Sequence, residues 1–139
     1  MNEKIALDFV IKLMDMTRLR KIRWEVSSHD SAYEPWRMPF KARLVGYAYD
    51  ASIEASIDTS FTSIRFQLFR CRLPIFESDI EPAGWDDELT YFLTLYDENG
   101  IFRDEISIKV VLEDLYEDVE NQIHPIADLI APVLELELK

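Results

Sequence analysis

The sequence predicts an α+β fold: an N-terminal helix, an antiparallel β-meander of five to six strands, and a C-terminal amphipathic helix followed by a short helix and tail. Two observations support this class. Apolar residues recur at helical spacing near both ends, and apolar residues alternate with polar ones in between. The 139 residues are enough for one hydrophobic core, so we expect a single domain over residues 1–139.

The stretch Leu89–Ile123 organises the predicted fold because it contains two strands, a tight turn and a helix. Side chains alternate along Leu89–Tyr96, and Asn99-Gly100 tolerates the positive φ that hairpin turns need. A more polar strand follows over Ile101–Ile108. The helix after it has no clear N-cap residue, and its apolar face should pack on the sheet. This face comprises Leu112, Leu115, Tyr116, Val119 and Ile123.

The N-terminal helix is predicted over residues 3–20 and carries two apolar stripes. One stripe comprises Ile5, Phe9, Leu13 and Met16, and the other comprises Leu7, Val10, Ile11 and Met14. This apolar surface is wider than one contact with a sheet requires. The helix is therefore either buried on both sides within the domain or available to a partner or a second copy.

Four further strands are predicted, over residues 22–26, 40–49, 52–58 and 63–73. Two long loops interrupt them, over residues 27–39 and 74–88, and long loops in compact domains are often functional. The first loop is rich in aromatic residues, with Tyr33 and Trp36. The second holds Trp85 within a run of carboxylates.

The C-terminal end is predicted to contain a short helix that begins at Pro125 and ends at Pro132, since proline disfavours a helix interior. Leucines alternate along the tail Val133–Lys139. This alternation predicts an edge strand in the domain or pairing with another chain. The tail and the N-terminal helix are thus the two candidates for homo-oligomer formation.

The net charge of −12 is concentrated in the second half of the chain. Residues 1–73 hold 12 basic and 9 acidic side chains, whereas residues 74–139 hold 3 and 18. An acidic surface of this kind disfavours direct binding to nucleic acid and favours a basic protein partner. A solvated face that only keeps the protein dispersed is the alternative explanation. The candidate partner-binding residues are Glu77, Asp79, Glu81, Trp85, Asp86, Asp87, Glu88, Glu113, Asp114, Glu117, Asp118 and Glu120.

The sequence contains no recognisable catalytic, cofactor or metal motif. Its three glycines form neither a P-loop nor a dinucleotide-binding turn, and His29 and His124 lack metal-ligand spacing. The single cysteine, Cys71, excludes an internal disulfide and fits a reducing cytoplasm. No segment has the pattern of a signal peptide or membrane span, so we expect a cytoplasmic protein without cofactor, metal or membrane contact.

Three segments, Met16–Glu25, Phe92–Gly100 and Leu112–Tyr116, together resemble a group of small uncharacterised bacterial and phage-borne α+β domains. The shared pieces are a Thr…Ile-x-Trp strand start, a D-x-x-G turn and a Leu-x-x-Leu-Tyr helix. The resemblance implies the fold and a bacterial or phage setting, and it carries over no functional residue. Domains of this build are common among immunity and defence-related proteins, which is an argument by analogy.

These observations favour a non-enzymatic acidic protein-binding module of the immunity or inhibitor kind. The first alternative is a nucleic-acid mimic that occupies the basic groove of a nucleic-acid enzyme. The second is a small ligand-binding domain or enzyme that uses loops 27–39 and 74–88.

Overall fold

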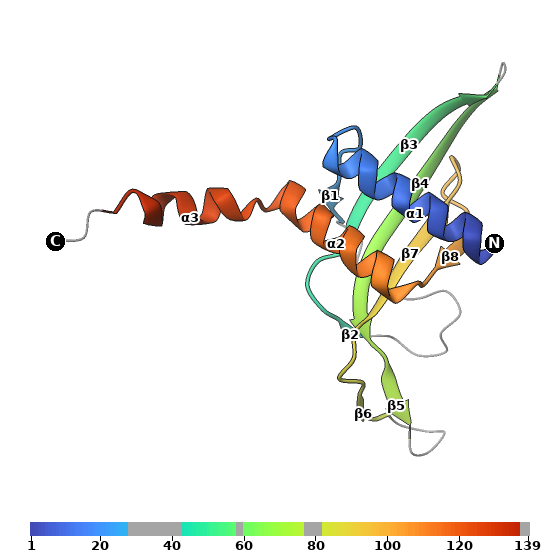
Figure 1. Cartoon of the computed structure of the whole chain (residues 1–139). Coiled ribbons are helices and arrows are strands. Elements are labelled where there is room, and N and C mark those ends of the chain that lie inside the picture. Colours follow the sequence, from blue (N-terminus) through green and yellow to red (C-terminus); the bar gives the residue numbers. More distant parts are fainter. Residues whose placement is uncertain (28–42, 58–59, 77–81, 137–139) are drawn as a thin grey trace.

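The computed structural model describes residues 1–27, 43–57, 60–76 and 82–136, and it has the predicted α+β architecture. Helices α1 and α2 lie side by side across one face of an antiparallel sheet (Figure 1). The elements are α1 (Glu3–Arg18), β1 (Glu25–Val26), β2 (Arg43–Leu44), β3 (Tyr49–Ile57), β4 (Ser60–Arg72), β5 (Pro74–Phe76), β6 (Pro82–Trp85), β7 (Thr90–Tyr96), β8 (Phe102–Ile106), α2 (Lys109–Ile123) and α3 (Ile126–Leu134).

The sheet has the strand order β1-β3-β4-β7-β8, and β2 also pairs with β4. All these pairings are antiparallel. The meander is interrupted once, because β5 and β6 form a separate two-stranded sheet between β4 and β7. Strand β4 is the hub of the sheet, since it pairs with β2, β3 and β7.

Helix α1 begins at a side-chain cap and ends at a backbone one. The Asn2 side chain accepts a hydrogen bond from the Lys4 amide at 2.7 Å, which satisfies one free donor of the first turn. At the other end, the Lys21 amide donates to Met16 O and the Arg20 amide to Thr17 O, with Arg20 at φ 57°. This pairing is a Schellman motif, and it ends the helix at Arg18, two residues before the predicted end.

The main core lies between the two helices and the sheet. Leu112, Leu115 and Val119 of α2 are completely buried there, as the helical spacing predicts. From α1, Val10, Leu13 and Met14 are buried, and Phe9 and Met16 pack against this core, whereas the remaining members of its two predicted stripes stay on the surface. The exposed apolar residues of α1 are Ile5, Leu7 and Ile11.

A second, smaller core lies on the sheet face opposite the helices. It contains Ala48, Phe69, Cys71 and Phe92, and the rings of Phe69 and Phe92 stack with centroids 5.5 Å apart. Burial raises the pKa of the Cys71 thiol to about 12, so this cysteine is protonated and unreactive at neutral pH. Strand β7 is therefore covered on both faces.

The predicted hairpin turn between β7 and β8 is confirmed. Asp97 Oδ1 accepts hydrogen bonds from the amides of Asn99 and Ile101, at 2.9 and 3.0 Å. Gly100 adopts φ 78°, the left-handed conformation that favours glycine. The carboxylate thus supplies the turn with the acceptors that the backbone lacks there.

Several predicted boundaries are wrong in instructive ways. The predicted strand over residues 22–26 shortens to β1, and the strand over residues 40–49 breaks at Gly46, which has φ 78°. Within loop 74–88, residues 74–76 and 82–85 form the β5–β6 hairpin instead of irregular chain. Loop 27–39, including Tyr33 and Trp36, lies outside the described residues, apart from Ser27.

The predicted edge strand in the C-terminal tail is also wrong for the described residues. Val133 and Leu134 belong to α3, and the chain beyond them to Leu136 forms no strand. Pro132 lies inside α3 instead of ending it. A proline this close to the helix end removes only one late hydrogen bond, and the helix stops two residues later.

Candidate functional site

The structure separates the candidate acidic residues into two neighbouring groups. Asp86, Asp87 and Glu88 lie in the connection between β6 and β7, and five others lie on α2. An ion pair between Glu88 and Lys109 holds the connection against the first residue of α2. Glu77, Asp79 and Glu81 fall outside the described residues.

Backbone carbonyls and two carboxylates hold the β6–β7 connection in place. Arg72 donates hydrogen bonds to the carbonyls of Asp86 and Asp87, at 3.2 and 2.9 Å. Asp86 Oδ1 in turn accepts a hydrogen bond from the Glu88 amide at 3.0 Å. Trp85 is half-buried at the end of β6. Asp86 and Glu88 therefore have a structural role, whereas the Asp87 carboxylate is fully exposed and lies 4.0 Å from Arg72.

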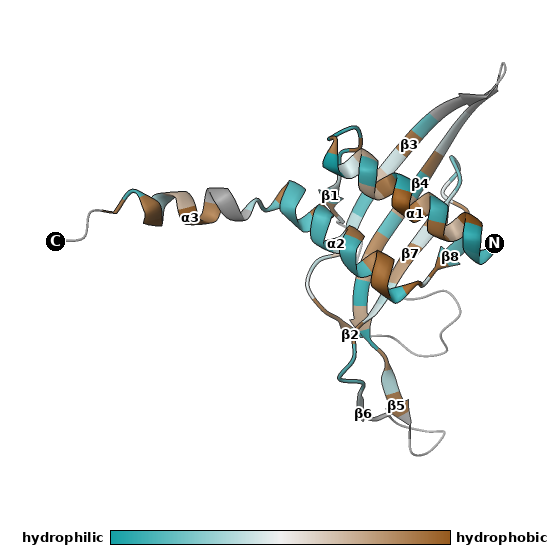
Figure 2. Ribbon diagram, in the orientation of Figure 1, coloured by the Kyte–Doolittle hydropathy of each residue, from teal (hydrophilic) through white to brown (hydrophobic). Residues whose placement is uncertain are grey.

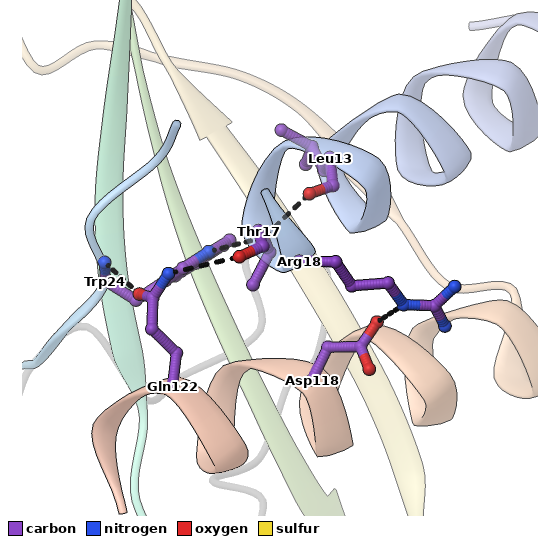
Figure 3. Close-up of polar contacts among 6 residues, drawn as sticks. All are labelled: Leu13, Thr17, Arg18, Trp24, Asp118 and Gln122. Atoms are coloured by element: carbon purple, nitrogen blue, oxygen red, sulfur yellow. Dashed lines mark hydrogen bonds and ion pairs between the residues drawn. The ribbon is translucent and has the colours of Figure 1, made fainter. Parts of the chain in front are cut away.

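Two of the five carboxylates on α2 are paired with cations of the same domain. Asp118 accepts a hydrogen bond from Arg18 Nε of α1 at 2.7 Å (Figure 3). Glu120 lies 3.7 Å from Arg70 of β4. Both carboxylates point from α2 toward neighbouring elements, and their charges are partly neutralised there.

The other three carboxylates of α2, Glu113, Asp114 and Glu117, form an exposed acidic ridge. In the described part of the chain they have no side-chain hydrogen bond and no ion pair. Residues three and four apart lie next to one another on a helix surface, so the three charges are neighbours. Lys109, one turn before Glu113, attracts that carboxylate without forming an ion pair with it, so the negative charge of the ridge is only partly offset within the described chain.

A buried polar network fixes α2, and therefore the acidic ridge, relative to α1 (Figure 3). Gln122 Oε1 accepts a hydrogen bond from the Trp24 amide at 2.9 Å, and its Nε2 donates to Ile22 O at 2.9 Å. Thr17 Oγ1 donates to Leu13 O at 2.7 Å and accepts from Trp24 Nε1 at 2.9 Å. These bonds tie the last turn of α2 to the chain that leaves α1.

An arginine and tyrosine cluster also holds α2 in place. The Arg70 guanidinium lies 4.5 Å from the ring centroid of Tyr116, a cation–π contact. The Tyr116 hydroxyl donates to Tyr47 O at 2.7 Å. A Cβ at Gly46 would lie 3.0 Å from that hydroxyl, so this close approach needs glycine. Burial raises the pKa of Tyr116 to about 12.

Tyr116→Phe is expected to lower the free energy of unfolding at neutral pH by about 0.5–1.5 kcal/mol, because the Tyr47 carbonyl loses its donor. The pKa of Tyr116 is higher in the folded chain, so the stability that it contributes is complete below the unfolded pKa of about 10. That contribution is lost as the pH rises toward about 12. Urea unfolding should therefore show that the free energy of unfolding falls less between neutral and alkaline pH in the variant than in the wild type. An equal fall in the two proteins would contradict this assignment.

The described surface pocket lies away from loop 74–88. A surface pocket of about 330 Å³ lies at the opposite end of the sheet, beside Tyr96, Arg103 and Asp104, and residues of that loop do not line it. No group of three potential metal ligands occurs among the described residues. His124 is exposed and packs against the Tyr47 ring, with centroids 5.7 Å apart.

In comparisons with known proteins, no family model, curated protein or solved structure matches this chain. None of the described helices is both long enough and apolar enough to cross a membrane. The fold defines the chain as an α+β domain with helices on one sheet face. The acidic ridge is its candidate functional surface.

Two residues that position the candidate site were missed by the sequence reasoning. Gln122 contacts residues about 100 positions away in sequence, and Arg70 pairs with a helix 50 positions away. Gln122 could have been found, because it is a polar residue on the buried side of an amphipathic helix. No local pattern identified Arg70 as a partner of Glu120 and Tyr116.

Proposed function

We propose that this chain is a non-enzymatic protein-binding module that holds a basic protein partner against the acidic ridge of α2. The observation that supports this most directly is that Glu113, Asp114 and Glu117 form no ion pair with any described residue, whereas Asp118 and Glu120 on the same helix are paired. The three carboxylates are therefore available to basic groups of a partner.

The ridge also has an energetic cost that favours a binding role. Glu113 and Glu117 are four residues apart, and like charges at that spacing destabilise a helix by about 0.2–0.5 kcal/mol, which the attraction between Lys109 and Glu113 offsets in part. The first turn of α2 contains no acidic residue, so the ridge charges are not placed to stabilise the helix dipole. A basic partner would relieve this repulsion when it binds.

The rigid attachment of α2 supports recognition by preformed charges. Leu112, Leu115 and Val119 anchor one side of the helix, and Gln122 fixes its last turn. A partner would therefore meet charges whose backbone is already ordered, which lowers the entropic cost of binding. The net charge of −15 on residues 74–139 would also steer a basic protein toward this half of the chain.

We further propose that the module is cytoplasmic, of bacterial or phage origin, and of the immunity, inhibitor or defence-related kind. The three sequence segments that resemble bacterial and phage domains support the origin. The buried, protonated thiol of Cys71 suits a reducing compartment. The exposed acidic ridge suits inhibition of an enzyme whose active-site groove is basic.

The test is capture of the partner from a lysate of the native host by immobilised protein, at low and high salt, with mass spectrometry of the retained proteins. The ridge variant carries Glu113→Gln, Asp114→Asn and Glu117→Gln. The control variant carries Asp8→Asn, Asp15→Asn and Glu98→Gln, which changes the net charge equally at exposed positions elsewhere. We expect a basic protein to bind the wild type and the control, with affinity for the ridge variant reduced about tenfold.

The outcomes separate this proposal from its alternatives. Displacement of the captured protein by duplex DNA would identify the ridge as a nucleic-acid mimic. Exposed charge pairs are screened by salt, so retention should fall as the salt concentration rises. Equal loss of binding in the ridge and control variants would show that net charge alone matters and would contradict the assignment to α2.

A further inference from the structure

Helix α3 projects away from the sheet and from α1 as an arm, beyond the end of α2 (Figure 1). Nearly all of its residues are apolar, and Asp128 is the one charged residue within it. Figure 2 shows hydrophobic stretches along this helix where it stands clear of the domain. Leu129 and Leu134 are each 76 % exposed, and Ile130 and Val133 are also exposed.

An apolar helix in this position requires a partner surface. Exposed apolar patches on monomers are normally small, and larger ones mark interaction sites. The arm has nine residues, so it is about 13 Å long and can present several apolar side chains to one partner. Its tip is acidic, because Glu135 caps its C-terminal end.

A basic turn of the chain lies near the base of the arm, beyond the carboxylates of α2 that Arg18 and Arg70 pair, and it complements the acidic tip. Gln122 binds the backbone of Ile22 and Trp24, and this places the preceding turn of chain beside the end of α2, three residues before α3 begins. That turn carries the exposed side chains of Arg20, Lys21 and Arg23. The exposed Leu19 adds an apolar side chain to the same turn.

We propose that the α3 arms of two copies of this chain pair antiparallel about a two-fold axis. In this arrangement the acidic tip of each arm, at Glu135, lies against the partner copy's basic turn, formed by Arg20, Lys21 and Arg23. The apolar side chains of the two arms cover one another between these charged ends. A symmetric pair uses the same surface twice, so both arms are covered at once.

Charge decides between this arrangement and two others. A parallel pair would bring the two Glu135 side chains together and would place two acidic domains at the same end. Docking of the arm onto the outer surface of α2 would bring Glu135 near the acidic ridge. The antiparallel pair avoids both repulsions, because it holds the two domains at opposite ends and pairs acid with base.

The test is sedimentation equilibrium of the full chain over a range of protein and salt concentrations. We expect a reversible dimer for the wild type. The double variant Leu129→Gln with Leu134→Gln should raise the dissociation constant on the order of a hundredfold, because both leucines lose their apolar cover. Glu135→Lys should raise it about threefold to tenfold and should reduce its dependence on salt.

The matched control is Ile5→Gln with Ile11→Gln, which changes two exposed apolar residues of α1 and should leave the dimer intact. The ridge variant should also dimerise normally, so failure of this inference is distinct from failure of the proposed partner binding. A wild type that stays monomeric at millimolar concentration would overturn the inference. So would a dimer lost only in the α1 control, or a monomer that co-sediments with phosphatidylcholine vesicles through the arm.

Discussion

Leu112→Ala is expected to lower the free energy of unfolding by about 2–5 kcal/mol, the largest effect that we predict for a single substitution. The Leu112 side chain is 0 % exposed and belongs to the core between α2 and the sheet. Truncation removes three buried carbons and leaves a cavity whose walls belong to both layers. Because these walls are held by the sheet pairing, they can collapse only partly.

Val110→Ala is the control for this substitution. Val110 lies two residues earlier on the same helix and is 73 % exposed, so its truncation should change the stability by no more than about 0.5 kcal/mol. Urea unfolding followed by circular dichroism measures both variants. If the two substitutions had equal effects, the packing of α2 described above would be wrong.

Gln122→Ala is expected to lower the free energy of unfolding by about 1–3 kcal/mol. The substitution leaves the Trp24 amide and the Ile22 carbonyl without the partners that they have at 2.9 Å. A buried backbone group without a hydrogen bond costs about this amount. We also expect faster hydrogen exchange at the Trp24 amide, because that bond holds the chain between α1 and β1 against α2.

Asn121→Ala is the matched control, since Asn121 is the preceding residue of α2 and is exposed. It should have little effect on stability or on exchange at Trp24. A Gln122→Ala variant that behaves like Asn121→Ala would show that the network in Figure 3 does not hold α2 in place. The ridge would then lack the fixed position on which the proposed recognition depends.

The elements with a strong hydrophobic period were predictable from the sequence. The spacing of Leu112, Leu115 and Val119 predicted α2, and the alternation in Leu89–Tyr96 predicted β7. The β5–β6 hairpin was missed because its strands are short and contain two prolines and a glycine, which locally resemble a loop. The position of α3 could not be predicted, because an apolar helix in a sequence normally indicates a core helix.

The candidate site was predictable in part. The acidic residues of α2 were evident from the sequence, but the sequence did not distinguish paired carboxylates from unpaired ones. Asp118 and Arg18 are 100 residues apart, and only the packing of α1 on α2 brings them together. The ridge of Glu113, Asp114 and Glu117 consists of the α2 carboxylates that form no such pair with a described residue.

Carbodiimide cross-linking of the captured complex, followed by mass spectrometry, tests the central claim most directly. This reagent joins a carboxylate to an amine that it contacts, so it reports which acidic side chains meet lysines of the partner. We expect cross-links from Glu113, Asp114 and Glu117 to the partner, and none from Asp8, Asp15 or Glu98. Cross-links confined to those three control positions would contradict binding through the acidic ridge of α2.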